Sequence, residues 1–164
     1  MELLYLVFWL LLAFLVVYIV RKLLYAYLFH LIAILYNRRI GARKQRLFEG
    51  LNRVKAKRGD GRLVILDLGV GPGANFQFFP PGSEVICVDP NRHYEPVVRN
   101  NVSKFPDVRV SQFHVGVAEN LRDWVESDSV DVVVSTLVLC SVNDVVRSLK
   151  EIIRVLKPVS SQSS

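Results

Sequence analysis

VILDLGVGPGANF, residues 64–76, joins an apolar run to a glycine-rich turn and carries Asp67 two positions before the first glycine. The three apolar residues that open it are typical of a central parallel strand, buried on both faces. Glycine accepts positive φ and lets backbone N–H groups approach a ligand without a Cβ in the way. The stretch therefore predicts a strand followed by a turn that can hold a nucleotide-type cofactor. Its alternative is a tight strand-to-helix turn that binds nothing.

Strand and helix patterns alternate through residues 61–158, which we expect to form one domain. Strands are expected at 63–68, 84–88, 108–113 and 130–135, and helices near 73–79, near 94–104, from 119 and over 143–156. Such a series favours an α/β fold with a parallel, doubly wound sheet and ligands at the carboxyl ends of the strands. The last six residues, 159–164, read VSSQSS and predict a disordered tail.

Distinctive residues follow each of the other three strands. Asp89 comes 20 residues after the first glycine, where a carboxylate can accept both hydroxyls of a ribose. Ala118 and Glu119 follow the third strand, and Thr136 and Leu137 follow the fourth. Taken singly, Asp89 could be a helix N-cap, Glu119 a carboxylate in the first turn of a helix, and the run 136–141 simply part of the core. Together at successive strand ends, they predict one site.

The N-terminus predicts a membrane anchor over residues 1–36. Residues 3–20 are 18 apolar residues without a charge, close to the length that crosses a bilayer core as a helix. A cleaved signal peptide is the alternative, but Glu2 precedes the run and Arg21 and Lys22 end it, which disfavours cleavage. Residues 23–36 form a shorter apolar run that suits the membrane interface.

Positive charge is concentrated in the segment that follows, residues 37–60, which we expect to be a basic juxtamembrane helix and linker. Eleven of the 21 Lys and Arg residues lie between positions 21 and 58, where Glu49 is the only acid. The positive net charge of +6 therefore comes from residues 21–58, and it does not indicate a nucleic-acid-binding domain. Basic residues beside a membrane segment predict anionic lipid contact and a domain that faces the cytosol, although a solvated helix face is an alternative reading.

The two cysteines, Cys87 and Cys140, both lie in apolar contexts and are expected to be buried thiols. The three histidines lie in unrelated contexts, and no Cys/His cluster is present in the sequence. No metal site is therefore predicted.

The residues also carry a resemblance. From residue 63 to 158 the chain resembles the class I S-adenosylmethionine-dependent methyltransferases, and among them the membrane-anchored methyltransferase-like family that methylates alkyl thiols at the endoplasmic reticulum and lipid droplets. The resemblance rests on GANFQFFPPGSEVICVDPN, AENL, VDVVVSTLVLCSV and EIIRVLKP, and it extends back to RKQRLFEGL and the hydrophobic N-terminus. It implies a Rossmann-like sheet, S-adenosyl-L-methionine as cofactor, a small lipophilic thiol as acceptor, and a location at the endoplasmic reticulum membrane and at lipid droplets.

Carried over by position, the resemblance implies that Asp67 and the glycines shape the pocket for the methionine part of the cofactor. It places the ribose hydroxyls on Asp89, the adenine beside Ala118 and Glu119, and the acceptor near residues Thr136 to Leu139. The cofactor-binding residues so implied are Asp67, Gly69, Gly71, Gly73, Asp89, Pro90, Ala118, Glu119, Thr136 and Leu137. No catalytic residue is assigned, because transfer to a thiol needs alignment more than acid–base help.

The end of the chain limits what the resemblance implies. The family continues with a fifth strand and an antiparallel pair, whereas this sequence stops six residues after Pro158. We therefore expect a methyltransferase sheet with only its first four strands, the fourth at an edge. Two alternatives stay open: a catalytically inactive membrane-anchored isoform, and an NAD-dependent oxidoreductase, since Gly69, Gly71 and Ala74 also fit GxGxxA.

Overall fold

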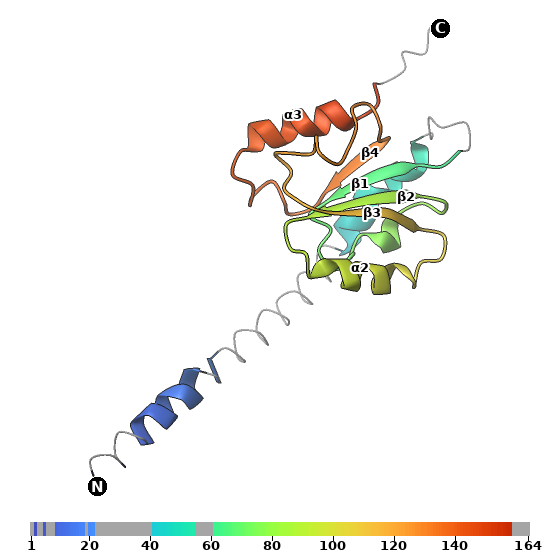
Figure 1. Ribbon diagram of the computed structural model, residues 1–164. Coiled ribbons are helices and arrows are strands. Elements are labelled where there is room, and N and C mark those ends of the chain that lie inside the picture. The colour runs from blue at the N-terminus through green and yellow to red at the C-terminus, as the bar shows by residue number, and fades with distance from the viewer. Residues whose placement is uncertain are drawn as a thin grey trace, which may run out of the picture. The chain divides into compact units, whose positions relative to one another are not determined.

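The computed structural model describes residues 41–54 and 61–158, and, nearer the N-terminus, residues 9–18 with positions 2, 5, 20 and 21. The chain divides into two compact units, Met1–Leu47 and Phe48–Ser164. The second unit holds a four-stranded sheet with helices on its faces (Figure 1). The predicted interfacial run at 23–36 and the predicted tail at 159–164 lie outside the described residues.

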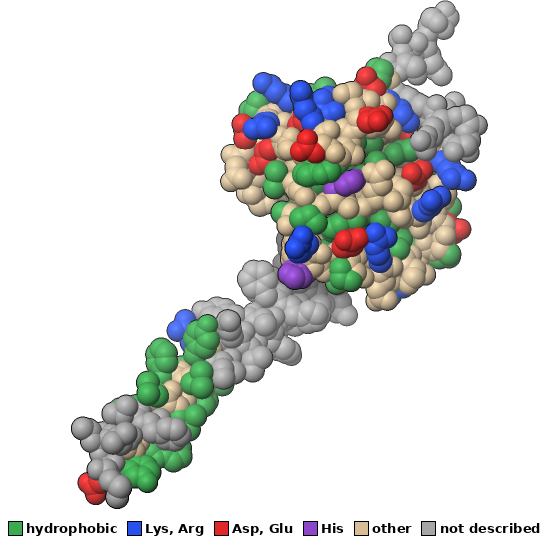
Figure 2. Space-filling model, viewed as in Figure 1, with side chains coloured by type: hydrophobic (Ala, Val, Ile, Leu, Met, Phe, Trp, Pro, Cys, Tyr) green, Lys and Arg blue, Asp and Glu red, His purple; other side chains and the backbone are tan. Residues whose placement is uncertain are grey.

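In the first unit, residues 9–18 are helical, and their large apolar side chains are exposed, Trp9 at 62% and Phe14 at 74% (Figure 2). Residues 41–47 are helical as well. No helix in the described part of the chain is both long and apolar enough to cross a membrane. The spanning helix predicted at 3–20 is therefore not seen among the described residues.

The sheet is parallel throughout, as predicted. Its strands are β1 (Val64–Leu68), β2 (Glu84–Asp89), β3 (Arg109–Val115) and β4 (Val132–Ser135), in the order β3-β2-β1-β4. β1 is central, and all five of its residues are buried, which is what a strand covered on both faces requires. β4 pairs with β1 through Ile65↔Val132 to Leu68↔Ser135, and it lies at one edge of the described sheet, as expected.

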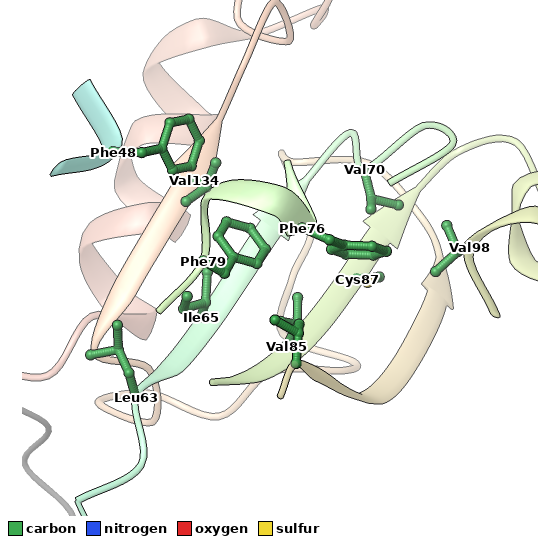
Figure 3. Packing of buried hydrophobic residues seen from close by; sticks show 11 residues of the cluster. Phe48, Leu63, Ile65, Val70, Phe76, Phe79, Val85, Cys87, Val98 and Val134 are labelled. Atoms are coloured by element: carbon green, nitrogen blue, oxygen red, sulfur yellow. The ribbon is translucent and has the colours of Figure 1, made fainter. Parts of the chain in front are cut away.

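The two faces of the sheet bury separate clusters, because successive side chains of a strand point to opposite sides. Ile65 packs with Phe76, Phe79 and Val98, the last from α2 (Tyr94–Val102) (Figure 3). Leu66 packs in the other cluster, whose members include Val155 from α3 (Val145–Val155). The two helices therefore cover opposite faces, as in a doubly wound fold (Figure 1).

Phe48 belongs to the first of these clusters, although it lies within the predicted basic segment. Its ring stacks on Phe78 with centroids 5.1 Å apart, and it packs beside Phe79. The short 3₁₀ helix η1 (Gly50–Arg53) follows it. A buried phenylalanine contributes about 1.5–3 kcal/mol, so this residue ties the start of the unit to the sheet.

Two predicted helices are wrong. Residues 71–75 form turns and lead into a single 3₁₀ turn, η2 (Phe76–Phe78), because Phe79 precedes Pro80 and takes an extended backbone. The helix predicted from 119 is also absent within the described residues. There, Val125 N donates to Leu121 O at 2.8 Å in a single turn, and the segment ends where Asp128 adopts φ of 55°.

Candidate functional site

A cavity of about 310 Å³ lies at the carboxyl ends of the four strands, the edge at which parallel α/β sheets bind ligands. It is lined by residues that follow every strand, so segments that lie far apart in sequence meet in one place. Eight of the ten predicted residues line it: Gly69, Gly71, Asp89, Pro90, Ala118, Glu119, Thr136 and Leu137. Asp67 and Gly73 do not.

The glycine turn, residues 69–75, approaches both β2 and the loop after β4. Gly69 has φ of 62°, its N–H donates to Val88 O at 2.8 Å, and a Cβ at this position would overlap the side chain of Val138. Gly71 has φ of 52°, but a Cβ there would meet nothing within 4 Å. The first glycine is therefore required by a close approach, whereas the second leaves space open beside the cavity.

Asp89 fastens this turn to β2. Its Oδ2 accepts from Gly71 N at 2.9 Å and its Oδ1 accepts from Asn91 N at 2.8 Å, while the residue is only 6% exposed. The N-cap of α2 is His93, so the alternative that Asp89 caps this helix is wrong. A carboxylate has about four acceptor positions, so both oxygens can still accept hydrogen bonds from a ligand in the cavity.

Glu119 connects the cavity to the N-terminus of α3. Its Oε1 accepts from Asn143 N at 2.7 Å and from Asp144 N at 3.3 Å, and Asp144 is the N-cap of α3. The predicted alternative, a carboxylate in the first turn of its own helix, is wrong because no helix begins here. The side chain accepts hydrogen bonds at the start of α3 instead. Its Oε2 is buried and has no hydrogen-bond partner among the described residues, an arrangement that suits a donor group on a ligand.

The β4–α3 loop, residues 136–144, brings Thr136 and Leu137 to the cavity. Leu137 has φ of 62° and is 64% exposed, and Cys140 is exposed too, so the alternative that this run is core is wrong. The prediction that Cys140 is buried is wrong for the same reason. A left-handed backbone at a leucine costs free energy and is most often kept where function requires it.

Asp67 is placed differently from the prediction. It is 0% exposed, and both of its carboxylate oxygens accept from Nδ2 of Asn75, at 3.1 and 3.2 Å. It pairs in the sheet with Cys87, a buried thiol whose pKa is raised well above its usual range by burial and, second, by this carboxylate. Asp67 therefore lies beneath the glycine turn, inside the unit, and not on the cavity wall.

Several residues at the site were not predicted. Asn75 is 2% exposed, and its amide also donates to Thr136 Oγ1 at 3.2 Å. Tyr94 and Val117 line the cavity, and so does Val138, which the resemblance places on the acceptor side. The asparagine at the end of the glycine-rich motif was the signal that pointed to a buried polar partner, while Tyr94 and Val117 look like ordinary helix and loop residues in sequence.

Within the described ranges, no group of His, Cys, Asp and Glu side chains could hold a metal ion. The polar residues at the cavity are instead two with carboxylates, three with hydroxyls and one with an amide: Asp89, Glu119, Tyr94, Thr136, Ser141 and Asn143. This set can accept and donate hydrogen bonds, but it contains no paired acid and base of the kind that hydrolysis uses.

Comparison with known proteins matches this part of the chain to one family. The family model described as a methyltransferase domain matches residues 66–161. Human thiol S-methyltransferase TMT1A is 40% identical over 125 residues, which is 76% of this chain and 50% of that protein. Human thiol S-methyltransferase TMT1B is 41% identical over 123 residues, 74% of this chain and 49% of that protein. The chain spans about half the length of these relatives.

Solved structures agree on the fold. The YcgJ protein from Bacillus subtilis superposes with a TM-score of 0.57 at 26% identity, over 71% of this chain and 47% of that one. CrArsM, an arsenic(III) S-adenosylmethionine methyltransferase from Chlamydomonas reinhardtii, superposes with a TM-score of 0.51 at 28% identity, over 58% of this chain and 36% of that one.

Proposed function

The chain belongs to the methyltransferase domain family, and on that premise we propose that its cavity binds S-adenosyl-L-methionine and that the protein transfers the methyl group to a small lipophilic thiol. One observation carries the proposal: the glycine turn, Asp89 and Thr136, from three different strand ends, meet in one cavity. Neither an NAD-dependent oxidoreductase nor an inactive isoform is favoured, because the matching family and relatives are methyltransferases.

The cavity residues fit the cofactor in size and in hydrogen-bonding chemistry. The volume of about 310 Å³ is at the lower end for a small-molecule site. Asp89 would hold the ribose hydroxyls, because both of its oxygens are fixed by backbone N–H groups and retain acceptor capacity. The unpartnered Oε2 of Glu119 can accept a hydrogen bond from an amino group, and the open space beside Gly71 leaves room for a close ligand.

When bound, S-adenosylmethionine supplies a sulfonium methyl group that a nucleophile can displace. The protein's own residues bind and orient the reactants, since such a displacement depends on holding the reacting atoms about 3–3.5 Å apart in line. A thiol with a pKa near ~8.5 supplies some thiolate without a strong base. The absence of an acid–base pair among the described cavity residues is therefore compatible with a thiol acceptor.

A lipophilic acceptor is supported by the residues around the β4–α3 loop. Leu137, Val138 and Val142 line the cavity there, and the first is largely exposed. The matched human relatives are named thiol S-methyltransferases. We extend that acceptor class to this chain as part of the proposal, because the apolar rim would favour alkyl over charged thiols.

We also propose that residues 1–36 anchor the protein at the endoplasmic reticulum membrane and at lipid droplets, with the domain in the cytosol. The support is the apolar N-terminal sequence, the exposed Trp9 and Phe14 on the helix of residues 9–18, and the basic residues that follow. Contact with membrane lipid is part of this proposal, whereas no nucleic acid is expected as a partner.

The test of the cofactor is calorimetry on the full 164-residue chain with S-adenosylhomocysteine and, in parallel, NADH. We expect binding of the first alone. Asp89→Ala should weaken it about tenfold or more, since a hydrogen bond to a charged group contributes about 1.5–3 kcal/mol. The exposed Asp107 supplies the matched control Asp107→Asn, which should bind like the wild type. Binding of NADH alone would overturn the assignment.

The test of the anchor is sodium carbonate extraction and imaging of the full chain expressed in cells, compared with a chain that lacks residues 1–36. We expect the full chain to stay in the membrane fraction and to colocalise with endoplasmic reticulum and droplet markers. The deleted chain should become extractable. Release of the full chain by carbonate would contradict the proposal.

A further inference from the structure

We propose that Asn75 is a positioning residue for methyl transfer: its amide joins β1 to the residue after β4 and so fixes the cofactor-binding turn relative to the acceptor side. The inference rests on the proposed function. It concerns a residue that lines no part of the cavity and therefore acts through others.

The first contact explains the buried charge beneath the turn. Asp67 is wholly buried in the centre of the sheet, and a buried carboxylate requires donors. Nδ2 of Asn75 donates to both carboxylate oxygens, at 3.1 and 3.2 Å. The two residues are eight positions apart, and the glycine turn lies between Asp67 and the end of that interval. The hydrogen bond therefore closes the turn onto the strand from which it starts.

The second contact reaches the other side of the site. The same Nδ2 donates to Thr136 Oγ1 at 3.2 Å, 61 positions away. Thr136 directly follows β4 and lines the cavity, while Asn75 is 2% exposed. An amide nitrogen has two hydrogens, so one can serve the carboxylate while the other serves the hydroxyl. The Thr136 hydroxyl accepts from Nδ2 and also donates to Oδ1 of Asn75 at 3.5 Å, so both polar atoms of the amide contact it.

Other side-chain hydrogen bonds of the glycine turn lead to β2 and α2. Asp89, the last residue of β2, accepts a hydrogen bond from Gly71 N. Asn101 of α2 donates to Pro72 O at 3.0 Å and to Gly73 O at 3.3 Å. These fix the turn relative to β2 and α2. The hydrogen bonds between Asn75 and Thr136 join the glycine turn to the β4–α3 loop. Because transfer rates fall steeply with misplacement of the reacting atoms, this link should control turnover more than cofactor affinity.

The test is a double-mutant cycle on the full chain in detergent micelles, with Asn75→Ala, Thr136→Val and the pair. Calorimetry with S-adenosylhomocysteine measures cofactor affinity, and methylation of hexanethiol by S-adenosylmethionine gives kcat. Thr136→Val keeps the side-chain shape, removes the hydroxyl and leaves the hydrogen bond to Asp67, so it should fold even if Asn75→Ala does not. Asn100→Ala, at an exposed position of α2, is the matched control.

We expect each single variant to lower kcat about tenfold or more, with a smaller change in cofactor affinity, and the pair to be no slower than the slower single variant. Thr136→Val with kcat within about twofold of the wild type would overturn the inference, as would additive losses in the pair. If the wild type binds no S-adenosylhomocysteine, the proposed function itself fails. If the wild type binds and turns over while the variants match it, only the role of Asn75 fails.

Discussion

Two loops that line the cavity are held in different ways. The glycine turn is fastened through buried side chains of Asp67, Asn75 and Asp89, and its closest approach is to Val138. The β4–α3 loop is fastened at its far end by Glu119, but between its ends it exposes Leu137 and Cys140. Under the proposed function, the cofactor side is formed by the fold itself and the acceptor side is open. Substitutions in the two loops should therefore have different effects.

The largest effect is expected at the point where the loops touch. Gly69→Ala forces a Cβ into a left-handed backbone and against Val138, which should lower the free energy of unfolding by about 2–4 kcal/mol. Gly71→Ala is the control, because its backbone is also left-handed but its Cβ meets nothing, so about 1–2 kcal/mol is expected. Urea unfolding measures both.

The pair Gly69→Ala with Val138→Ala separates strain from crowding. Removing the valine methyl groups should restore the part of the loss that comes from overlap, so the two substitutions should be non-additive. Equal losses for Gly69→Ala and Gly71→Ala, with strict additivity in the pair, would show that the two loops do not constrain each other.

The second effect concerns Glu151, which holds the segment that carries Glu119 by accepting a hydrogen bond from Leu121 N. Glu151 of α3 accepts from Leu121 N at 3.0 Å and pairs with Arg154 at 2.8 Å. The hydrogen bond from Arg154 is the main cause that holds the pKa of Glu151 below its ordinary value of 4.5, outweighing burial, which raises it. A lowered folded-state pKa means that Glu151 stabilises the fold above its unfolded pKa, and this stabilisation is lost as pH falls through the folded pKa.

The measurement is the thermal midpoint of the wild type and of Glu151→Gln between about pH 7 and pH 3. The variant keeps an oxygen acceptor but lacks the charge, so it should be less stable by about 1.5–3 kcal/mol near neutrality. The difference between the two proteins should shrink as pH falls below 4.5. A difference that stays constant down to pH 3 would contradict this account.

A smaller effect is expected when the β4–α3 loop is released. Glu119→Ala removes the acceptor from Asn143 N and Asp144 N, which should cost about 1–3 kcal/mol and raise hydrogen exchange across residues 136–144. The glycine turn should keep its protection. Glu119→Gln retains an oxygen for these N–H groups and should stay close to the wild type. Equal loss of protection in both loops would show that they are one unit.

The smallest effect on stability is expected at Leu137. Asparagine tolerates the left-handed backbone better than leucine does, and the leucine buries little surface. Leu137→Asn should therefore change the free energy of unfolding by about 1 kcal/mol or less, toward greater stability, while it lowers turnover of hexanethiol. Leu139→Asn, at a half-buried neighbour without positive φ, should destabilise instead. Unchanged turnover in Leu137→Asn would show that this residue does not contact the acceptor.

The strands and the strand-end residues could be predicted because they depend on local pattern. β1 follows from an apolar run, and Asp89 from its place at the end of the next strand. The helices around 73–79 and from 119 could not be predicted correctly. In the first, the proline after Phe79 imposes an extended backbone, and in the second the N–H of Leu121 bonds to Glu151, 30 positions away. Pro80 is visible in a local window and weakens the first helix, whereas the partner of the second segment is not visible there.

The amino-acid sequence by itself determined the parallel sheet, the glycine turn and the order in which Asp89, Glu119 and Thr136 reach the sheet edge, because strand period and glycine chemistry act over a few residues. Only the tertiary structure decided what those residues do there. Asp67, expected to shape the pocket, is instead buried and accepts a hydrogen bond from Asn75. Glu119 accepts from the backbone at the start of α3, and Leu137 is exposed. These outcomes depend on which groups meet across 8 to 61 positions of chain, because burying a polar atom without a hydrogen-bond partner costs free energy.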